Sequence, residues 1–171
     1  MKRRGGPFRI AVLLPLGLAL GAAPALADPP QGYDFLPYDQ GLKQARAEHK
    51  KVLLYFGRYG CGFCQKTNEE TFSDPELKRR LTDHYVLVYA DAEGADRLTL
   101  PSGERITERE LGSRLNAFAT PLFVFLSAAG KVLFRAPGYK TVKQFERMDR
   151  YIHSGAYRHE SYSKFAKGAQ S

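Results

Sequence analysis

The two cysteines of this chain, Cys61 and Cys64, are separated only by Gly62 and Phe63. An apolar run at 52–56 precedes this C-x-x-C sequence, and a short break containing two glycines lies between them. A strand, a turn and a C-x-x-C pair that opens a helix are typical of a site for thiol–disulfide exchange. The sequence therefore predicts a redox-active cysteine pair.

The predicted place of the pair, at the start of a helix, accounts for its reactivity. Unpaired backbone N–H groups and the positive end of the helix dipole favour a thiolate over a thiol. A cysteine in such a place has its pKa lowered from about 8.5 to roughly 3.5–7.5, and the thiolate is the attacking species. We therefore expect Cys61, which is closer to the start of the helix, to be the attacking thiol.

Other uses of a C-x-x-C pair fit this sequence less well. A structural zinc site takes four protein ligands, whereas the pair supplies two and His84 lacks finger-like spacing to it. Covalent haem needs a histidine directly after the second cysteine, where this chain has Gln65. A purely structural disulfide stays open as an alternative, although a bridge across so short a loop constrains the unfolded chain little. We expect no metal and no cofactor at the pair.

The first 27 residues have the composition of an export signal. Basic residues occupy the start, an apolar stretch runs from Ile10 to Leu20, and Ala25-Leu26-Ala27 is a small-x-small cleavage site. The apolar stretch is shorter than the roughly 20 residues that a membrane-spanning helix needs. We predict a cleaved signal peptide at 1–27, with an uncleaved membrane anchor as the alternative.

The 144 residues after this signal are enough for one domain with its own hydrophobic core. They carry 22 basic and 18 acidic side chains, so the net charge of +8 falls to +4. A mild positive balance without a helix-turn-helix, zinc-finger or RNA-binding signature predicts no nucleic-acid partner. Export would place both cysteines in an oxidising compartment.

Apolar periodicity, capping residues and turn residues divide the chain into alternating helices and strands. Residues 28–37 are rich in chain-breaking residues and predict a linker, 38–152 predict the folded domain, and 153–171 predict a C-terminal tail. The expected helices span about 39–50, 62–70, 73–84, 107–118 and 142–152, and the expected strands span 52–56, 85–90, 122–126 and 131–135.

Two capping boxes and one irregular segment stand out between these elements. Ser73 with Glu76 three residues later forms the first box, and Thr107 with Glu110 forms the second. The segment from about 91 to 106 is long for a loop in a compact domain, and loops of this length are often functional or disordered. We expect it to be a surface hairpin beside the core.

Thr120-Pro121 precedes the apolar run at 122–126. A proline at the first position of a buried strand is unusual, because proline cannot donate to the strand ladder. The placement suggests a specific turn, and we predict a cis peptide bond before Pro121 that borders the cysteine pair.

The order of these elements resembles the thioredoxin superfamily over residues 39–152. The C-x-x-C pair after a strand and Thr120-Pro121 at the head of a later strand carry the resemblance. It implies an α/β thioredoxin-like fold, with a central mixed sheet flanked by helices and an extra N-terminal helix. The segments at 72–77, 98–107 and 134–139, together with the export signal, resemble the SoxW group of periplasmic thioredoxins associated with sulfur-oxidation systems.

This resemblance implies a role for each matching residue. Cys61 would be the exposed nucleophile and Cys64 the resolving thiol. Pro121 would be the cis-proline beside them, and Thr120 would offer its backbone N–H and C=O to an extended substrate, as in strand addition.

The chain departs from cytosolic thioredoxins at three places around the pair. Gly60 stands where those proteins have a tryptophan, and Gly62-Phe63 replaces their Gly-Pro. Tyr55 stands where they bury an aspartate that exchanges a proton with the resolving thiol. These departures leave the proton acceptor for Cys64 and the redox potential open.

Arg58 and Lys66 lie near Cys61 in sequence and are further candidates for tuning the pair. A cation beside the attacking sulfur would stabilise its thiolate, favour the reduced form and raise the potential. Both residues would thereby shift the protein toward an oxidant, against the direction that the resemblance implies.

The expected function is that of a periplasmic thiol–disulfide oxidoreductase that mainly reduces protein disulfides. The resemblance implies a membrane electron donor of the DsbD or CcdA type, and substrates among cysteine-bearing periplasmic carriers or apocytochromes. Two alternatives stay open. One is a disulfide oxidant or isomerase with the same fold, and the other is a non-catalytic binding module that presents a static disulfide.

Overall fold

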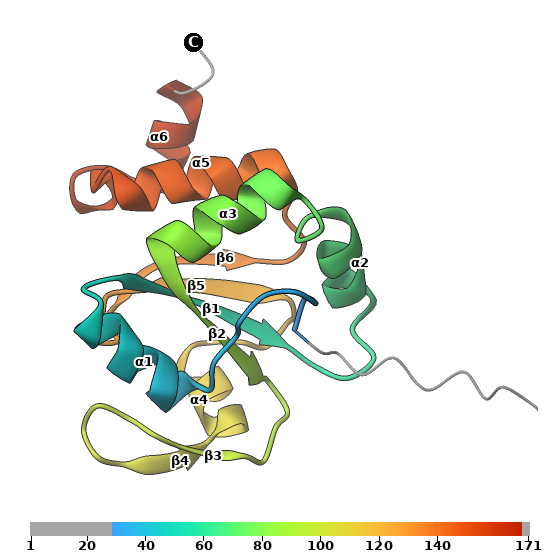
Figure 1. The fold of residues 1–171 in the computed structure, drawn as a ribbon, viewed down its shortest axis with the longest axis vertical. Coiled ribbons are helices and arrows are strands. Elements are labelled where there is room, and N and C mark those ends of the chain that lie inside the picture. Colours follow the sequence, from blue (N-terminus) through green and yellow to red (C-terminus); the bar gives the residue numbers. More distant parts are fainter. Residues whose placement is uncertain (1–28, 169–171) are drawn as a thin grey trace, which may run out of the picture.

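The computed structural model describes residues 29–168. At its centre lies a four-stranded sheet in the order β2-β1-β5-β6 (Figure 1). Strands β1 (Lys51–Gly57) and β2 (Tyr85–Asp91) run parallel, whereas β5 (Leu122–Leu126) is antiparallel to both β1 and β6 (Val132–Pro137). The mixed central sheet expected from the sequence is therefore present.

Helices cover both faces of this sheet (Figure 1). One face packs against α2 (Gly62–Glu70), α3 (Pro75–His84) and α5 (Val142–His153). The other packs against α1 (Tyr38–Ala47), the expected extra N-terminal helix, and α4 (Glu108–Arg114).

The side chains of β1 alternate between these two layers, as the pleat of a strand requires. Leu53 and Tyr55 belong to the core beneath α2, α3 and α5, whereas Leu54 and Phe56 belong to the core beneath α1 and α4. All four side chains are fully buried. The continuous apolar run of β1 thus reflects a central strand that is covered on both faces.

Residues 29–37 pack against the domain, although their composition predicts a linker. Leu36 forms a parallel bridge with Val88 at the edge of β2, and its N–H donates to the Leu87 carbonyl at 2.9 Å. Tyr33 and Phe35 pack onto the core beside Phe72. The proline-rich composition of this segment does not indicate that Tyr33, Phe35 and Leu36 pack on the domain. The predicted signal peptide at 1–27 lies outside the described residues.

The irregular segment after β2 forms the expected surface hairpin. Strands β3 (Arg97–Thr99) and β4 (Arg105–Thr107) pair antiparallel, and Leu98 lies opposite Ile106. Both of these side chains are buried against the layer of α1 and α4. The hairpin is therefore anchored to the core by its two central side chains.

The starts of α1 and α3 differ from the sequence prediction in detail. Helix α1 begins at Tyr38 after Pro37, so Asp39 lies in its first turn and is not its N-cap. Helix α3 is capped by Asp74, whose side chain accepts from the Leu77 N–H at 2.8 Å. Asp74, and not Ser73, is the N-cap residue because Pro75 favours the first position of the helix. The residue directly before Pro75 is therefore the one at the N-cap position.

Two helix ends also come earlier than expected. Helix α1 ends at Ala47, and His49 adopts a left-handed backbone with φ of 54°. Helix α4 keeps its Thr107–Glu110 capping box but ends at Arg114, and Asn116 has φ of 57°. A left-handed residue just past the last turn is a common way to terminate a helix.

The segment between α5 and residue 168, predicted as a tail, folds back onto the domain through aromatic side chains. It forms a 3₁₀ turn (η1, Ala156–Arg158) and a short helix, α6 (Tyr162–Gly168). The rings of Tyr162 and Phe165 lie 5.3 and 5.2 Å from the ring of Tyr151 on α5. Within residues 29–168 no helix is both long and apolar enough to cross a membrane.

Candidate active site

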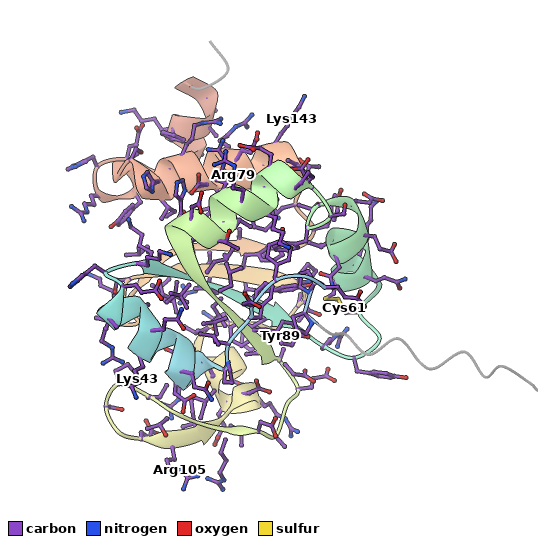
Figure 2. The ribbon with its side chains drawn as sticks, viewed as in Figure 1. Lys43, Cys61, Arg79, Tyr89, Arg105 and Lys143 are labelled. Carbon is purple, nitrogen blue, oxygen red and sulfur yellow. A yellow bond between two sulfur atoms is a disulfide. The ribbon has the colours of Figure 1, made fainter. Side chains whose placement is uncertain are left out.

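Cys61 and Cys64 form a disulfide at the start of α2 (Figure 2). Cys61 is the N-cap residue, and its sulfur accepts from the Cys64 N–H at 3.1 Å. The Cys61 carbonyl accepts from the N–H of Gln65 at 3.1 Å, which closes the first turn. The sequence prediction that the pair opens a helix after a strand is therefore correct.

The two sulfur-bearing side chains differ in access. Cys64 is 2% exposed and belongs to the core, whereas Cys61 is only partly buried. An incoming thiolate or disulfide therefore meets Cys61 first. The helix N-terminus also acts on Cys61 directly, because the Cys64 N–H points at its sulfur.

Thr120 and Pro121 lie against the disulfide, in the turn that leads into β5. The Thr120–Pro121 bond is cis, as the sequence predicts. The Thr120 hydroxyl donates to the Cys61 sulfur at 3.2 Å, a side-chain contact that the sequence alone does not indicate. The Pro121 carbonyl accepts from the Gly138 N–H at 2.7 Å, which ties this turn to the end of β6.

Three exposed aromatic side chains lie close in sequence to the cysteine pair or to Thr120. Phe63 lies between the cysteines and is 65% exposed, Tyr59 precedes Cys61 by two residues and is 57% exposed, and Phe118 precedes Thr120 by two residues and is 81% exposed. They are the exposed large hydrophobic side chains among residues 29–168. Of the three, only Phe63 is a candidate from the sequence. Tyr59 lies in a short loop, where an apolar residue outside any periodic pattern was a signal, whereas Phe118 fits the helical spacing predicted for 107–118 and gave none.

Tyr55 lies beneath the pair, buried in the sheet. Its hydroxyl donates to the Asn68 side-chain oxygen at 3.2 Å and lies 3.5 Å from the Cys64 carbonyl. Burial raises the pKa of Tyr55 well above its usual value, and the nearby Tyr89 adds to this. Tyr55 therefore stays protonated at neutral pH and is no base for the Cys64 thiol. Asn68, one turn after Cys64, is a neighbour that the sequence pattern does not indicate.

Arg58 and Lys66, the two cations close to Cys61 in sequence, both contact carboxylates. The Arg58 guanidinium lies 2.9 Å from the Glu93 carboxylate in the segment after β2. The Lys66 ammonium lies 3.9 Å from the Glu70 carboxylate one turn along α2 and 4.9 Å from the centre of the Tyr139 ring. Each carboxylate offsets the positive charge of the cation that it contacts.

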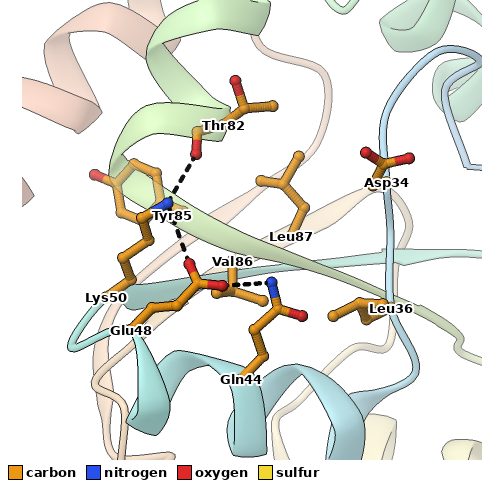
Figure 3. Close-up of a pocket in the computed structure, with 9 residues that line it drawn as sticks. All are labelled: Asp34, Leu36, Gln44, Glu48, Lys50, Thr82, Tyr85, Val86 and Leu87. Carbon is orange, nitrogen blue, oxygen red and sulfur yellow. Dashed lines mark hydrogen bonds and ion pairs between the residues drawn. The ribbon is translucent and has the colours of Figure 1, made fainter.

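Gly62 has open space around it, since a side chain there would meet no atom within 4 Å. A hollow of about 170 Å³ lies between α1, α3 and β2 (Figure 3). Its polar groups bond to one another, because Glu48 accepts from Gln44 at 2.7 Å and pairs with Lys50 at 3.2 Å. This hollow does not contact either cysteine.

Comparison with known proteins agrees with the geometry of the site. The family model for the thioredoxin-like domain matches residues 38–153. The chain belongs to the thioredoxin-like family. Its C-x-x-C pair, placed at a helix N-terminus beside a cis-proline, makes this thioredoxin-like protein a thiol–disulfide oxidoreductase. No curated protein matches the sequence.

Solved structures share the fold of this thioredoxin-like protein. A thioredoxin from Thermus thermophilus is 27% identical, with a TM-score of 0.56 over 69% of this chain and 85% of that chain. A thioredoxin-fold protein from Helicobacter pylori is 22% identical, with a TM-score of 0.60 over 72% and 81%. A putative disulphide-isomerase from Bacteroides thetaiotaomicron is 22% identical, with a TM-score of 0.57 over 71% and 93%.

Proposed function

We propose that this thioredoxin-like protein is exported to the periplasm and works mainly as a reductant of protein disulfides. One observation supports a reductant over an oxidant. Arg58 and Lys66 each lie against a carboxylate, so neither supplies an unopposed positive charge to the Cys61 sulfur. A strong oxidant needs a heavily stabilised thiolate, because that stabilisation is what raises the potential of the pair.

The proposed reaction begins with the reduced protein. The Cys61 thiolate attacks one sulfur of a substrate disulfide, forms a mixed disulfide and releases the first substrate sulfur as a thiolate. The Cys64 thiolate then attacks the Cys61 sulfur and releases the second substrate sulfur. The substrate has gained two electrons, and the protein is left with the Cys61–Cys64 disulfide that the structure contains.

The surroundings of Cys61 fit a polypeptide substrate. Thr120 sits next to the sulfur at the head of β5, where its backbone can pair with an extended chain. The exposed rings of Tyr59, Phe63 and Phe118 offer apolar contacts to a substrate whose disulfide is attacked by Cys61. A protein disulfide flanked by apolar residues is therefore the proposed substrate class.

An exported reductant needs a source of electrons across the membrane. We propose a membrane donor of the DsbD or CcdA type, which would reduce the Cys61–Cys64 disulfide after each cycle. The export pattern at 1–27 supports the periplasmic location. The segments at 72–77, 98–107 and 134–139 support a place in the SoxW group, with cysteine-bearing carriers or apocytochromes as substrates.

One contact favours the alternative of an oxidant or isomerase. The Thr120 hydroxyl donates to the Cys61 sulfur and stabilises its thiolate, which raises the potential. This is a single hydrogen bond at a partly exposed site, and we expect it to be too weak to make the pair a strong oxidant.

Covalent trapping tests the proposed roles of the cysteines. Cys64→Ser should accumulate mixed disulfides between Cys61 and its substrates, because no thiol is left to resolve them. Cys61→Ser, the matched control, should trap almost none, since Cys64 is buried. Mass spectrometry of the trapped proteins from periplasmic extract identifies the substrates. Trapping by Cys61→Ser and not by Cys64→Ser would reverse the assignment, and trapping by neither would support a binding module.

A further inference from the structure

A cluster of two histidines and an aspartate lies where α3 and α5 end. His84 is the last residue of α3 and His153 is the last residue of α5. Their rings lie face to face, with centroids 4.1 Å apart and an angle of 19° between the planes. Asp149 stands one turn before His153 on the same side of α5, and its carboxylate is 2.8 Å from His84 Nδ1.

Asp149 is held in place by more than the histidine. Its side chain is 1% exposed, and its Oδ1 accepts from the Tyr85 hydroxyl at 2.9 Å. Its second oxygen has one long contact, 3.5 Å from an Arg80 guanidinium nitrogen. An ionised carboxylate is an acceptor only, so the short contact holds a proton between His84 Nδ1 and the Asp149 carboxylate. A divalent ion would displace this proton and bind both the ring nitrogen and the carboxylate oxygen.

We propose that His84, His153 and Asp149 form a binding site for a divalent cation of the zinc type. One ligand atom from each residue lies within 4.8 Å of the others. Imidazole nitrogen with one carboxylate oxygen suits Zn²⁺, which binds such atoms at about 2.0–2.2 Å in tetrahedral geometry and leaves the fourth position to water. The ions Cu²⁺ and Ni²⁺ share this preference for imidazole.

Two features of the cluster favour a cation. The C-terminal ends of two helices meet there, and the partial negative charge of each helix end attracts positive charge. The cluster is also open to solvent, since His84 is 26% exposed and His153 is exposed. An ion can therefore enter with part of its water shell, and the exposed His153 ring can turn its lone pair from the stacked position toward the ion.

The charge of Arg80 opposes this attraction, because it lies on the second oxygen of Asp149. We therefore expect modest affinity, below that of a closed structural zinc site. Binding would join the ends of α3 and α5 and raise the stability of the folded protein by linkage. These helix ends lie away from α2 and its disulfide (Figure 1), so the site is independent of the proposed redox function.

The four histidines of the chain provide a matched test. His153→Asn removes a ligand from an exposed position, so the fold should persist. The control is the double variant His49→Asn and His159→Asn. It removes two imidazoles, whereas each ligand variant removes one, and it leaves the cluster whole. Asparagine suits position 49 because it tolerates the left-handed backbone there. His84→Asn is a second ligand variant, and circular dichroism checks that it folds.

The measurement is titration of untagged protein with zinc chloride against a chromophoric zinc indicator. The protein is kept oxidised, so that the disulfide sulfurs cannot bind the ion. We expect one ion per chain for the wild type and the control, and affinity at least about tenfold weaker for His153→Asn and His84→Asn. We also expect zinc to raise the Tm of the wild type and the control, but not of the ligand variants. Equal affinity in the ligand variants, loss of binding in the control, or no stoichiometric binding by the wild type would each overturn the site.

Discussion

The Thr120 hydroxyl donates a hydrogen bond to the Cys61 sulfur at 3.2 Å, across 59 positions of sequence. The contact joins the turn before β5 to the start of α2, the two places that define the candidate active site. A donor aimed at this sulfur stabilises the thiolate more than the disulfide, because hydrogen bonds to charged groups are the stronger ones. It is therefore a direct influence on the redox chemistry of the pair.

Replacing Thr120 with valine keeps the shape of the side chain and removes the donor. We expect loss of about 1 kcal/mol of thiolate stabilisation, which is a rise of about 0.7 in the pKa of the Cys61 thiol and a fall of about 20 mV in potential. Ultraviolet absorbance of the thiolate against pH measures the first value. Thr120→Ser keeps the hydroxyl and should behave like the wild type. An unchanged pKa in Thr120→Val would mean that the hydroxyl does not act on the thiolate.

Glu93→Gln should release the Arg58 guanidinium from its carboxylate partner. The freed charge then favours the Cys61 thiolate, so the pKa of the Cys61 thiol should fall by about 0.3 and the potential should rise slightly. Both groups are exposed, so high salt should remove most of the difference. Glu48→Gln is the control, because it removes a carboxylate that pairs with Lys50 just after the end of α1. A rise in the pKa, or no change at low salt, would contradict the role given to the Arg58–Glu93 pair.

Tyr55→Phe tests whether the buried tyrosine takes part in proton transfer. The raised pKa keeps Tyr55 protonated, so the rate at which Cys64 resolves a mixed disulfide should stay within about twofold of the wild type. Stability should fall by about 1 kcal/mol through loss of the hydrogen bond to Asn68. Stopped-flow kinetics and urea unfolding measure the two effects. A loss of rate of about a hundredfold, the scale of a general base, would assign Tyr55 a catalytic role.

Glu108 should make stability depend on pH. Partial burial raises the pKa of its carboxyl to about 7, the carboxylates of Asp96 and Asp91 add to this, and a hydrogen bond from the Asp91 backbone opposes it. The folded state then holds the proton more tightly than the unfolded state, so this contribution to stability is complete below about pH 4.5 and is lost as pH rises through 7. Glu108→Gln should be more stable than the wild type by roughly 1 kcal/mol at pH 8, a value reduced because the group is half-exposed, and no more stable at pH 4. Urea unfolding at both pH values checks the sign, and a larger gain at pH 4 would contradict it.

The sequence contained enough information for the fold and for the cysteine pair, because both depend on local patterns. Apolar runs predicted the strands, and the helix that starts at Gly62 followed from the residues around it. The side-chain contacts that tune the site could not be predicted in the same way. Arg58 meets Glu93 because two loops, 35 positions apart, lie together at one end of the sheet. Sequence proximity alone placed Arg58 beside Cys61 as an unpaired cation.

The same limit applies to the cluster of His84, His153 and Asp149. His84 and Asp149 are 65 positions apart and meet because α3 packs on α5. None of the three residues belongs to a recognisable pattern within its own helix. They come together only because of the way the two helices pack. The packing of Tyr33 and Phe35 onto Phe72 could not be predicted from the sequence either. A proline-rich segment shows no apolar periodicity that would indicate which side chains are buried.

The equilibrium redox potential of the Cys61–Cys64 pair tests the central claim most directly. Titration against glutathione, followed by thiol alkylation and mass spectrometry, measures it. We predict reversible exchange with a potential of about −250 mV or lower, in the range of thioredoxins that act as reductants. A potential near −120 mV, typical of strong disulfide oxidants, or a disulfide that does not exchange at all, would contradict it.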